Sequence, residues 1–213
     1  MNILIGSFEE RLRKSISFAW GIFSEKVGSG LILINKEASM QLQYSYILQQ
    51  VIPLICFSDQ ESARIELETG VKVEGKYREI DLVLIGSNGG NDYNVAVEMK
   101  CYREYAASGG KRGATDIFMK DVYEDLHLLE SYCKHAGFHK GVALVMNDLE
   151  RLVNPKKKEA KCWDYDISNS TKVSNRHLTT PIGGKSVDLK VAKSYEFKWV
   201  KNGSFWFLEN EGV

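Results

Sequence analysis

Apolar residues recur at helical spacing in residues 7–26 and in residues 116–137, which predicts an α-helix over each segment. The first segment opens with a capping box formed by Ser7 and Glu10. Its apolar stripe consists of Phe8, Leu12, Ile16, Trp20 and Phe23. The second segment ends on Gly137, a suitable C-terminal stop. Its apolar stripe consists of Phe118, Val122, Leu126, Leu129 and Cys133.

A further helix is predicted over residues 35–55, where the apolar stripe is weaker. Asn35 is the expected N-cap, and Pro53 limits the far end because the residue before a proline disfavours the helical conformation. The pattern then changes to alternation of apolar and polar positions. In residues 63–73 this alternation places Ile65, Leu67 and Thr69 on one strand face and the two intervening glutamates on the other.

Two more strands are predicted over residues 77–86 and 93–102, and the glycine-rich segment between them is a strong hairpin signal. Three consecutive strands with short links indicate an antiparallel meander. Residues 140–148 are nearly all apolar and follow the helix predicted over residues 116–137. A strand after such a crossover helix is expected to pair in parallel with a strand of the meander.

The C-terminal part has weaker signals. Residues 154–190 are polar and broken, and residues 194–209 are expected to form a hairpin that turns at Asn202 and Gly203. We therefore predict one domain over residues 1–213. Its fold class is a mixed α/β fold, with a central mixed β-sheet flanked by helices, an extra N-terminal helix and a C-terminal hairpin.

Composition sets limits on the partners of this chain. Hydrophobic residues make up 44% and charged residues 26%, which suits a packed soluble core. Lys plus Arg and Asp plus Glu both number 28, so any polyanion site must come from local clustering. The four cysteines lack zinc-site spacing, and no apolar run suits a bilayer or a signal peptide. We expect a cytoplasmic protein with no membrane partner.

Three charges interrupt the apolar strands of the meander. Asp81 lies in one strand, and Glu98 and Lys100 lie in the next, where alternation points both toward the same face. Two adjacent carboxylates repel each other, but a hard cation such as Mg²⁺ binds one or two carboxylates together with water and phosphate. A nearby ammonium would stabilise developing negative charge, so the set suits metal-assisted phosphodiester hydrolysis. The alternative is a group of solvated charges at strand ends without any function.

These residues resemble a known family pattern. "REID" at 78–81 followed by "VEMK" at 97–100 resembles the PD-(D/E)xK nuclease superfamily, whose core is the restriction-endonuclease-like fold. The resemblance covers roughly residues 35–146, and it departs from the pattern at Ile80, where the family often has proline. It implies a nuclease that depends on Mg²⁺, or on Mn²⁺, with Asp81 and Glu98 as metal ligands and Lys100 as the catalytic lysine.

Two further carboxylates are candidate metal ligands. Some members of the superfamily contribute a glutamate from the helix before the meander, and Glu37 is the residue available here. A carboxylate at a helix N-terminus is also an ordinary partner of the helix dipole. Glu66 is the second candidate, although it shares its strand face with Glu68, so a solvated face is the simpler explanation of both.

The resemblance implies a nucleic-acid partner, with DNA expected and RNA as the alternative, in restriction, defence or repair. Lys111 and Arg112 lie in a glycine-rich loop suited to phosphate contacts, and Lys120 follows on the next helix beside Tyr123, on a face expected to be solvated. A lysine run at 156–158 is a weaker candidate. A homodimer is also expected from the family, with the first helix as its interface through Trp20 and Phe23. The competing hypothesis is a catalytically silent nucleic-acid-binding or protein-binding module on the same fold.

Overall fold

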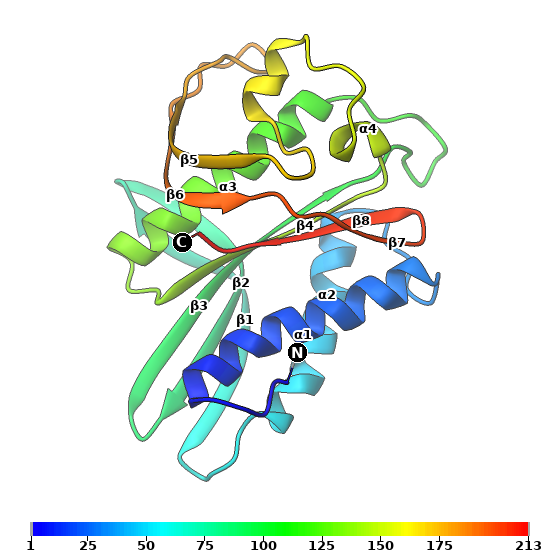
Figure 1. Cartoon of the computed structure of the whole chain (residues 1–213). Helices are drawn as coiled ribbons and strands as arrows, with labels where there is room; N and C mark the ends of the chain where they lie inside the picture. Colours follow the sequence, from blue (N-terminus) through cyan, green and yellow to red (C-terminus); the bar gives the residue numbers. More distant parts are fainter. Residues whose placement is uncertain (1, 213) are drawn as a thin grey trace.

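A six-stranded mixed sheet forms the centre of the computed structural model, which describes residues 2–212 (Figure 1). The helices are α1 (Phe8–Gly28), α2 (Glu37–Val51), α3 (Thr115–His135) and α4 (Glu150–Val153), with the 3-10 helices η1 (Ile52–Leu54) and η2 (Lys161–Tyr165). The strands of the sheet, in spatial order, are β1 (Glu61–Val73), β2 (Lys76–Asn88), β3 (Asn91–Tyr102), β4 (Lys140–Asn147), β8 (Phe205–Asn210) and β7 (Val200–Asn202). A separate two-stranded sheet consists of β5 (Lys172–Leu178) and β6 (Leu189–Glu196).

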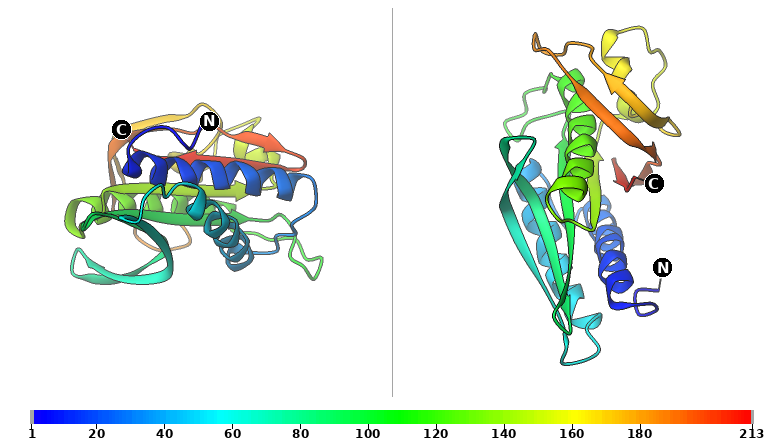
Figure 2. Two further views of the ribbon diagram at one scale, coloured as in Figure 1. Left: turned by 90° about the horizontal axis from the view of Figure 1, so that it is seen from below. Right: turned by 90° about the vertical axis from the view of Figure 1, so that its left-hand side faces the viewer.

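The strand connections confirm the predicted mixed α/β fold. β1, β2 and β3 form an antiparallel meander, and β4 pairs in parallel with β3 after the crossover through α3. β8 then pairs antiparallel with β4 and extends the sheet on that side. Figure 2 shows α1 and α2 on one face of the sheet, and α3 with the C-terminal segment on the other. No helix within residues 2–212 combines the length and the apolar character needed to cross a membrane.

The face covered by α1 and α2 has an aromatic core. The predicted capping box at Ser7 and Glu10 starts α1, and the whole predicted apolar stripe of this helix is buried. Trp20 stacks on Phe23 with ring centroids 5.1 Å apart, and both rings also pack against Phe207 of β8. Trp20 and Phe23 are 5% and 0% exposed, so the prediction that they supply a dimer interface is wrong. Both rings belong to the hydrophobic core beneath α1 and α2, so they are not available to a second copy of the chain.

The ends of α2 differ slightly from the prediction. Lys36, not Asn35, is the N-cap residue. The hydroxyl of Ser39 accepts hydrogen bonds from the backbone N–H groups of Asn35 and Lys36, which fixes the chain entering the helix. The helix ends at Val51, two residues before Pro53, and continues as η1.

The C-terminal segment covers α3 more completely than the sequence indicates. Tyr165 of η2 and Phe197 pack against Tyr123, and all three rings are fully buried. The predicted solvated face of α3 is therefore wrong at Tyr123. Within residues 154–190, expected to be irregular, the chain forms η2 and β5. The terminal hairpin turns one residue later than predicted, at Gly203 and Ser204, because Asn202 belongs to β7 and pairs with Phe205; residues 194–196 belong to β6.

The regular alternation predicted for residues 63–73 is interrupted at Glu68. Its φ angle of +51° lies in the left-handed region, which a regular strand does not use. The partner strand changes faces at the matching position, because Ile80 packs in the core beneath α3 whereas Leu82 packs in the core beneath α1 and α2. Asp81 lies between them, so the irregularity in both strands changes the direction of this carboxylate.

Candidate active site

The sheet opens between β2 and β3 at the predicted charges. The two strands pair from Asn88 opposite Asn91 as far as Leu82 opposite Val97, where their ladder ends. Beyond this point β2 remains paired with β1, and the two strands curl away from β3 as a ribbon (Figure 2). Asp81 and Glu98 would form the next pair, so these carboxylates flank the opening. Asp81 Oδ2 accepts a hydrogen bond of 2.6 Å from the Met99 N–H across it.

Glu98 is a buried carboxylate, with only 4% of its surface exposed. The Tyr132 hydroxyl of α3 donates a hydrogen bond of 2.9 Å to Glu98 Oε1. Burial raises the pKa of Glu98 well above its ordinary value, and the nearby carboxylates of Asp125 and Asp81 raise it further. Burial thus disfavours the ionised form of Glu98, and a bound cation would offset this cost.

Lys100 lies on the same strand and is held between two helices. Its Nζ is 3.4 Å from Asp125 Oδ2 of α3 and 3.5 Å from Glu37 Oε1 of α2. Burial acts to lower the pKa of Lys100, but the carboxylates of Asp125 and Glu37 outweigh it and raise the pKa above its ordinary value. Lys100 is a permanently charged ammonium at the sheet opening.

Asp125 is a functional candidate that the sequence interpretation missed. It is 5% exposed, and its Oδ2 has no hydrogen-bond partner among the described residues, although the Lys100 ammonium is nearby. Burial raises the pKa of Asp125 to about 8. A sequence signal was present, because Phe118, Val122, Asp125, Leu129 and Tyr132 follow an alternating spacing of four and three residues along one helical face. A carboxylate within such a stripe faces the core.

The structure brings Glu37 into the site but leaves Glu66 outside it. The N–H of Cys101 donates a hydrogen bond of 3.2 Å to Glu37 Oε2, and burial raises the pKa of this carboxylate. Glu66 instead pairs with Arg64 at 3.1 Å on the exposed side of β1. Its neighbour Glu68 is nearer to the site, since the Gln41 amide donates to Glu68 Oε1 and to the Asp81 carbonyl.

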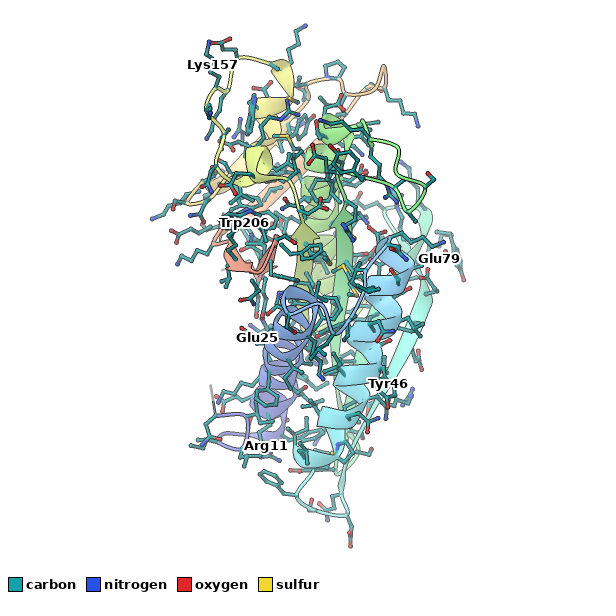
Figure 3. The ribbon with its side chains drawn as sticks, turned by 90° about the vertical axis from the view of Figure 1, so that its right-hand side faces the viewer. Arg11, Glu25, Tyr46, Glu79, Lys157 and Trp206 are labelled. Atoms are coloured by element: carbon teal, nitrogen blue, oxygen red, sulfur yellow. The ribbon has the colours of Figure 1, made fainter. Side chains whose placement is uncertain are left out.

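One cavity of about 490 Å³ lies between the β1–β2 ribbon and α3, and Glu37 is not part of its lining. Its acidic and basic lining includes Asp81, Glu98, Lys100, Asp121, Glu124 and Asp125. Carboxylates outnumber cations in this lining, so the cavity favours a cation. Glu79 also lines it and lies at the opposite edge of the molecule from Lys157 in Figure 3. The predicted lysine run at 156–158 is therefore not adjacent to the site.

The predicted nucleic-acid contacts lie outside this cavity. Lys111 is exposed on its loop and pairs with Glu104 at 3.0 Å. Arg112 donates a hydrogen bond of 3.1 Å to the Asn35 carbonyl. Lys120 pairs with Glu124 at 2.6 Å and also with Asp121, and both of these carboxylates line the cavity. Of the three cations, Lys120 therefore lies nearest to the site.

The donor set can be tested against the chemistry of Mg²⁺. Within residues 2–212, no group of three or more histidine, cysteine or acidic side chains has the arrangement of a ready metal site. Mg²⁺ needs fewer protein ligands, since one or two carboxylates with waters and a phosphate are sufficient. Asp81 and Glu98 supply two such ligands, and Asp125 Oδ2, which has no hydrogen bond among the described residues and lies 3.4 Å from Lys100 Nζ, is a further hard donor. The oxygen donors present therefore fit a two-carboxylate site.

Comparison of the chain with protein-family models, with curated proteins and with solved structures found no match. The resemblance to the PD-(D/E)xK superfamily therefore stays a prediction. The geometry of the site is the basis for any functional proposal.

Proposed function

We propose that this chain is a metal-dependent nuclease that hydrolyses phosphodiester bonds, in the manner of the PD-(D/E)xK superfamily. DNA is the expected substrate, and a role in restriction, defence or repair suits such an activity. The observation that carries the proposal is the convergence of Asp81, Glu98 and Lys100 in one cavity, where the β2–β3 ladder opens. Buried carboxylates in excess over cations are costly for a fold, which favours a functional explanation.

Each side chain has a task in the proposed reaction. Asp81 and Glu98 would hold Mg²⁺, which when bound polarises a phosphoryl oxygen and lowers the pKa of a water. Tyr132 orients Glu98 and favours its ionised form through the hydrogen bond to Oε1. Lys100 would stabilise negative charge that develops on the phosphoryl group, because its ammonium lines the same cavity. Glu37 and Asp125 fix the position of that ammonium from opposite sides of the sheet.

The test compares substrates, metals and variants in one assay. Plasmid, single-stranded DNA and RNA are each incubated with the protein in Mg²⁺, in Mn²⁺ or in chelator. We expect cleavage in the presence of metal and none in chelator. Asp81→Asn should lower cleavage at least about 100-fold, because it replaces a proposed metal ligand. Substituting residues that only hydrogen-bond to a metal ligand already lowers activity about 10–100-fold. Glu66→Gln is the matched control, because it removes one carboxylate from β1 outside the cavity.

Each other outcome selects a different conclusion. If none of the substrates is cut and Mg²⁺ does not bind, the nuclease proposal is wrong and a silent binding module on this fold takes its place. If only RNA is cut, the reaction stands and the substrate is RNA. Equal activity of Asp81→Asn and Glu66→Gln would show that another site cuts the substrate.

A further inference from the structure

A second cavity of about 660 Å³ adjoins the acidic one. Three segments far apart in the sequence enclose it: the turn of the β1–β2 ribbon, the N-terminal half of α3, and the 182–189 segment that precedes β6. In Figure 1, the ribbon turn and this segment both lie on the left side of the molecule. Arg78, Asp121 and Glu124 line both cavities, so the second cavity continues the first along α3.

The 182–189 segment is a fixed wall of this cavity. The N–H of Lys185 donates a hydrogen bond of 3.1 Å to the Ile182 carbonyl, which closes a four-residue turn. The two central residues, Gly183 and Gly184, have φ angles of +61° and +73°, as a type I′ turn requires. Ile182 and Leu189 are each 8% exposed and anchor the segment on both sides of Lys185. The position of Lys185 is therefore set by a packed turn.

The charges of the second cavity leave two cations without partners. Its acidic side chains are all engaged: Glu74 by Ser131 and His127, Asp188 by His177, and Asp121 and Glu124 by Lys120. Lys76 on the ribbon and Lys185 on the opposite segment are exposed, and neither forms an ion pair with any residue in 2–212. Two free ammonium groups thus come from two different walls.

The composition of the lining indicates the kind of ligand. Ile117, Ile182 and Leu189 supply apolar surface, while Lys76 and Lys185 supply positive charge. Apolar surface suits the face of a base or sugar, and ammonium groups suit phosphates. A volume of about 660 Å³ is typical of sites for small ligands, not for a duplex. Bases in a duplex are stacked and paired, so they enter a cavity only where the strand is unpaired.

Building on the nuclease function proposed above, we propose that this second cavity binds the unpaired nucleotides next to the scissile phosphate. The preferred substrate is therefore nucleic acid that is single-stranded at the site of cleavage. Lys76 and Lys185 bind its phosphates, and the acidic cavity receives the phosphodiester that is cut. The 182–189 segment determines which strands are accepted.

The test measures binding of a fluorescein-labelled single-stranded DNA 12-mer and of its duplex by anisotropy, in chelator and over a range of KCl concentrations. The variant is Lys76→Ala with Lys185→Ala. The control is Lys72→Ala with Lys190→Ala, which removes the same charge from the ribbon and from the strand after the 182–189 segment, at exposed residues outside both cavities. All four lysines are exposed, so neither double variant disturbs the core.

We expect the wild-type chain to bind the single strand more tightly than the duplex. The Lys76 and Lys185 variant should weaken this binding, and its slope of log K against log salt should be smaller by about 1.4, or about 0.7 for each lost phosphate contact. The control should keep the wild-type slope. With Mg²⁺ present, the same variant should raise KM for the single strand and leave kcat nearly unchanged, because neither lysine reaches the reacting atoms.

Two results would overturn the inference: equal salt slopes in the variant and the control, or wild-type binding of the single strand that is absent or no tighter than binding of the duplex. The two proposals fail separately. A chain that binds single strands through Lys76 and Lys185 but cuts nothing contradicts the nuclease function alone. A chain that cuts DNA in a way that depends on Asp81, with both double variants behaving alike, contradicts the second cavity alone.

Discussion

Two sets of buried charge in this protein differ in how completely they are paired. Arg11 of α1 donates hydrogen bonds to the carbonyls of Ile55 and Gly6 and to both carboxylate oxygens of Glu61. Glu61 also accepts a hydrogen bond from the Phe57 N–H, and its pKa is lowered. Every polar atom of this group has a partner, and the charges balance. An ion pair of this kind needs no ligand.

The cluster at the β2–β3 opening is the opposite case. One ammonium, Lys100, is shared by the carboxylates around it, and the pKa values of Glu98 and Asp125 are both raised. Asp125 retains a buried oxygen without a hydrogen bond among the described residues. The difference shows that burial of charge alone does not mark a functional site. An excess of one sign in the lining of a cavity, with one buried oxygen that lacks a hydrogen bond, is the informative feature.

The largest effect is expected from Asp125→Asn in metal-free protein. The folded-state pKa of Asp125 is about 8 and the ordinary value is 3.8, so the folded chain binds an extra proton between these pH values. This contribution to stability is fully present below the ordinary pKa and is lost as pH rises through about 8. The wild type should therefore lose about 1.4 kcal/mol per pH unit relative to the variant in this range. Urea unfolding at pH 5, 6, 7 and 8 measures the difference, and a constant difference would contradict the raised pKa.

A smaller effect is expected from Arg11→Met, which should lower thermal stability without changing cleavage. Loss of the guanidinium leaves Glu61 and two carbonyls without their partner, so the melting temperature should fall by at least about 5 °C. Cleavage measured well below the melting temperature should be unchanged, because Arg11 contacts none of the cavity residues. Loss of cleavage at unchanged stability would remove the distinction between the paired and unpaired sets.

The smallest effect compares two buried tyrosines on opposite faces of the sheet. Tyr132→Phe removes the hydrogen bond that favours ionised Glu98, so the pKa of Glu98 should rise further. The acidic limb of the pH–rate profile should move to higher pH by about 1 unit, the equivalent of one hydrogen bond. Tyr44→Phe is the matched control, since its hydroxyl donates to the Ile16 carbonyl at 3.1 Å beneath α1. The same shift in both variants would mean that the Tyr132 contact is structural only.

The parts of the fold predicted from sequence are those in which local pattern and tertiary packing agree. The stripe of α1 is identified by its periodicity, and the meander by its strand patterns and short links. β4 is buried on both faces, so its apolar run and its place after α3 identify it. The C-terminal segment could not be predicted in this way. Its elements are short, and Tyr165 and Phe197 are buried by packing against Tyr123 of α3, which is far away in the sequence. Burial of Tyr123 depends on that same long-range contact.

The candidate site was predicted where its residues share two neighbouring strands. Asp81, Glu98 and Lys100 line one cavity, and Glu37 of α2 contacts Lys100. Asp125 and Tyr132 were missed because they lie on α3. They reach the site only because α3 crosses the β2–β3 opening with this face toward it, and the sequence does not show that arrangement. Glu66 was a candidate under regular alternation, but the irregular backbone at Glu68 and the pairing of Glu66 with Arg64 place it outside the site.

The proposed reaction requires that the excess carboxylates at the sheet opening bind a divalent cation. Isothermal titration calorimetry with Mg²⁺ at pH 7, in two buffers of different ionisation enthalpy, tests it most directly. We expect the wild type and Glu66→Gln to bind Mg²⁺ and to release protons, because Asp125, whose pKa is raised to about 8, must ionise beside the metal. Asp81→Asn should bind far more weakly. Absence of binding to the wild type, or equal binding by Asp81→Asn and Glu66→Gln, would show that these carboxylates do not form a metal site.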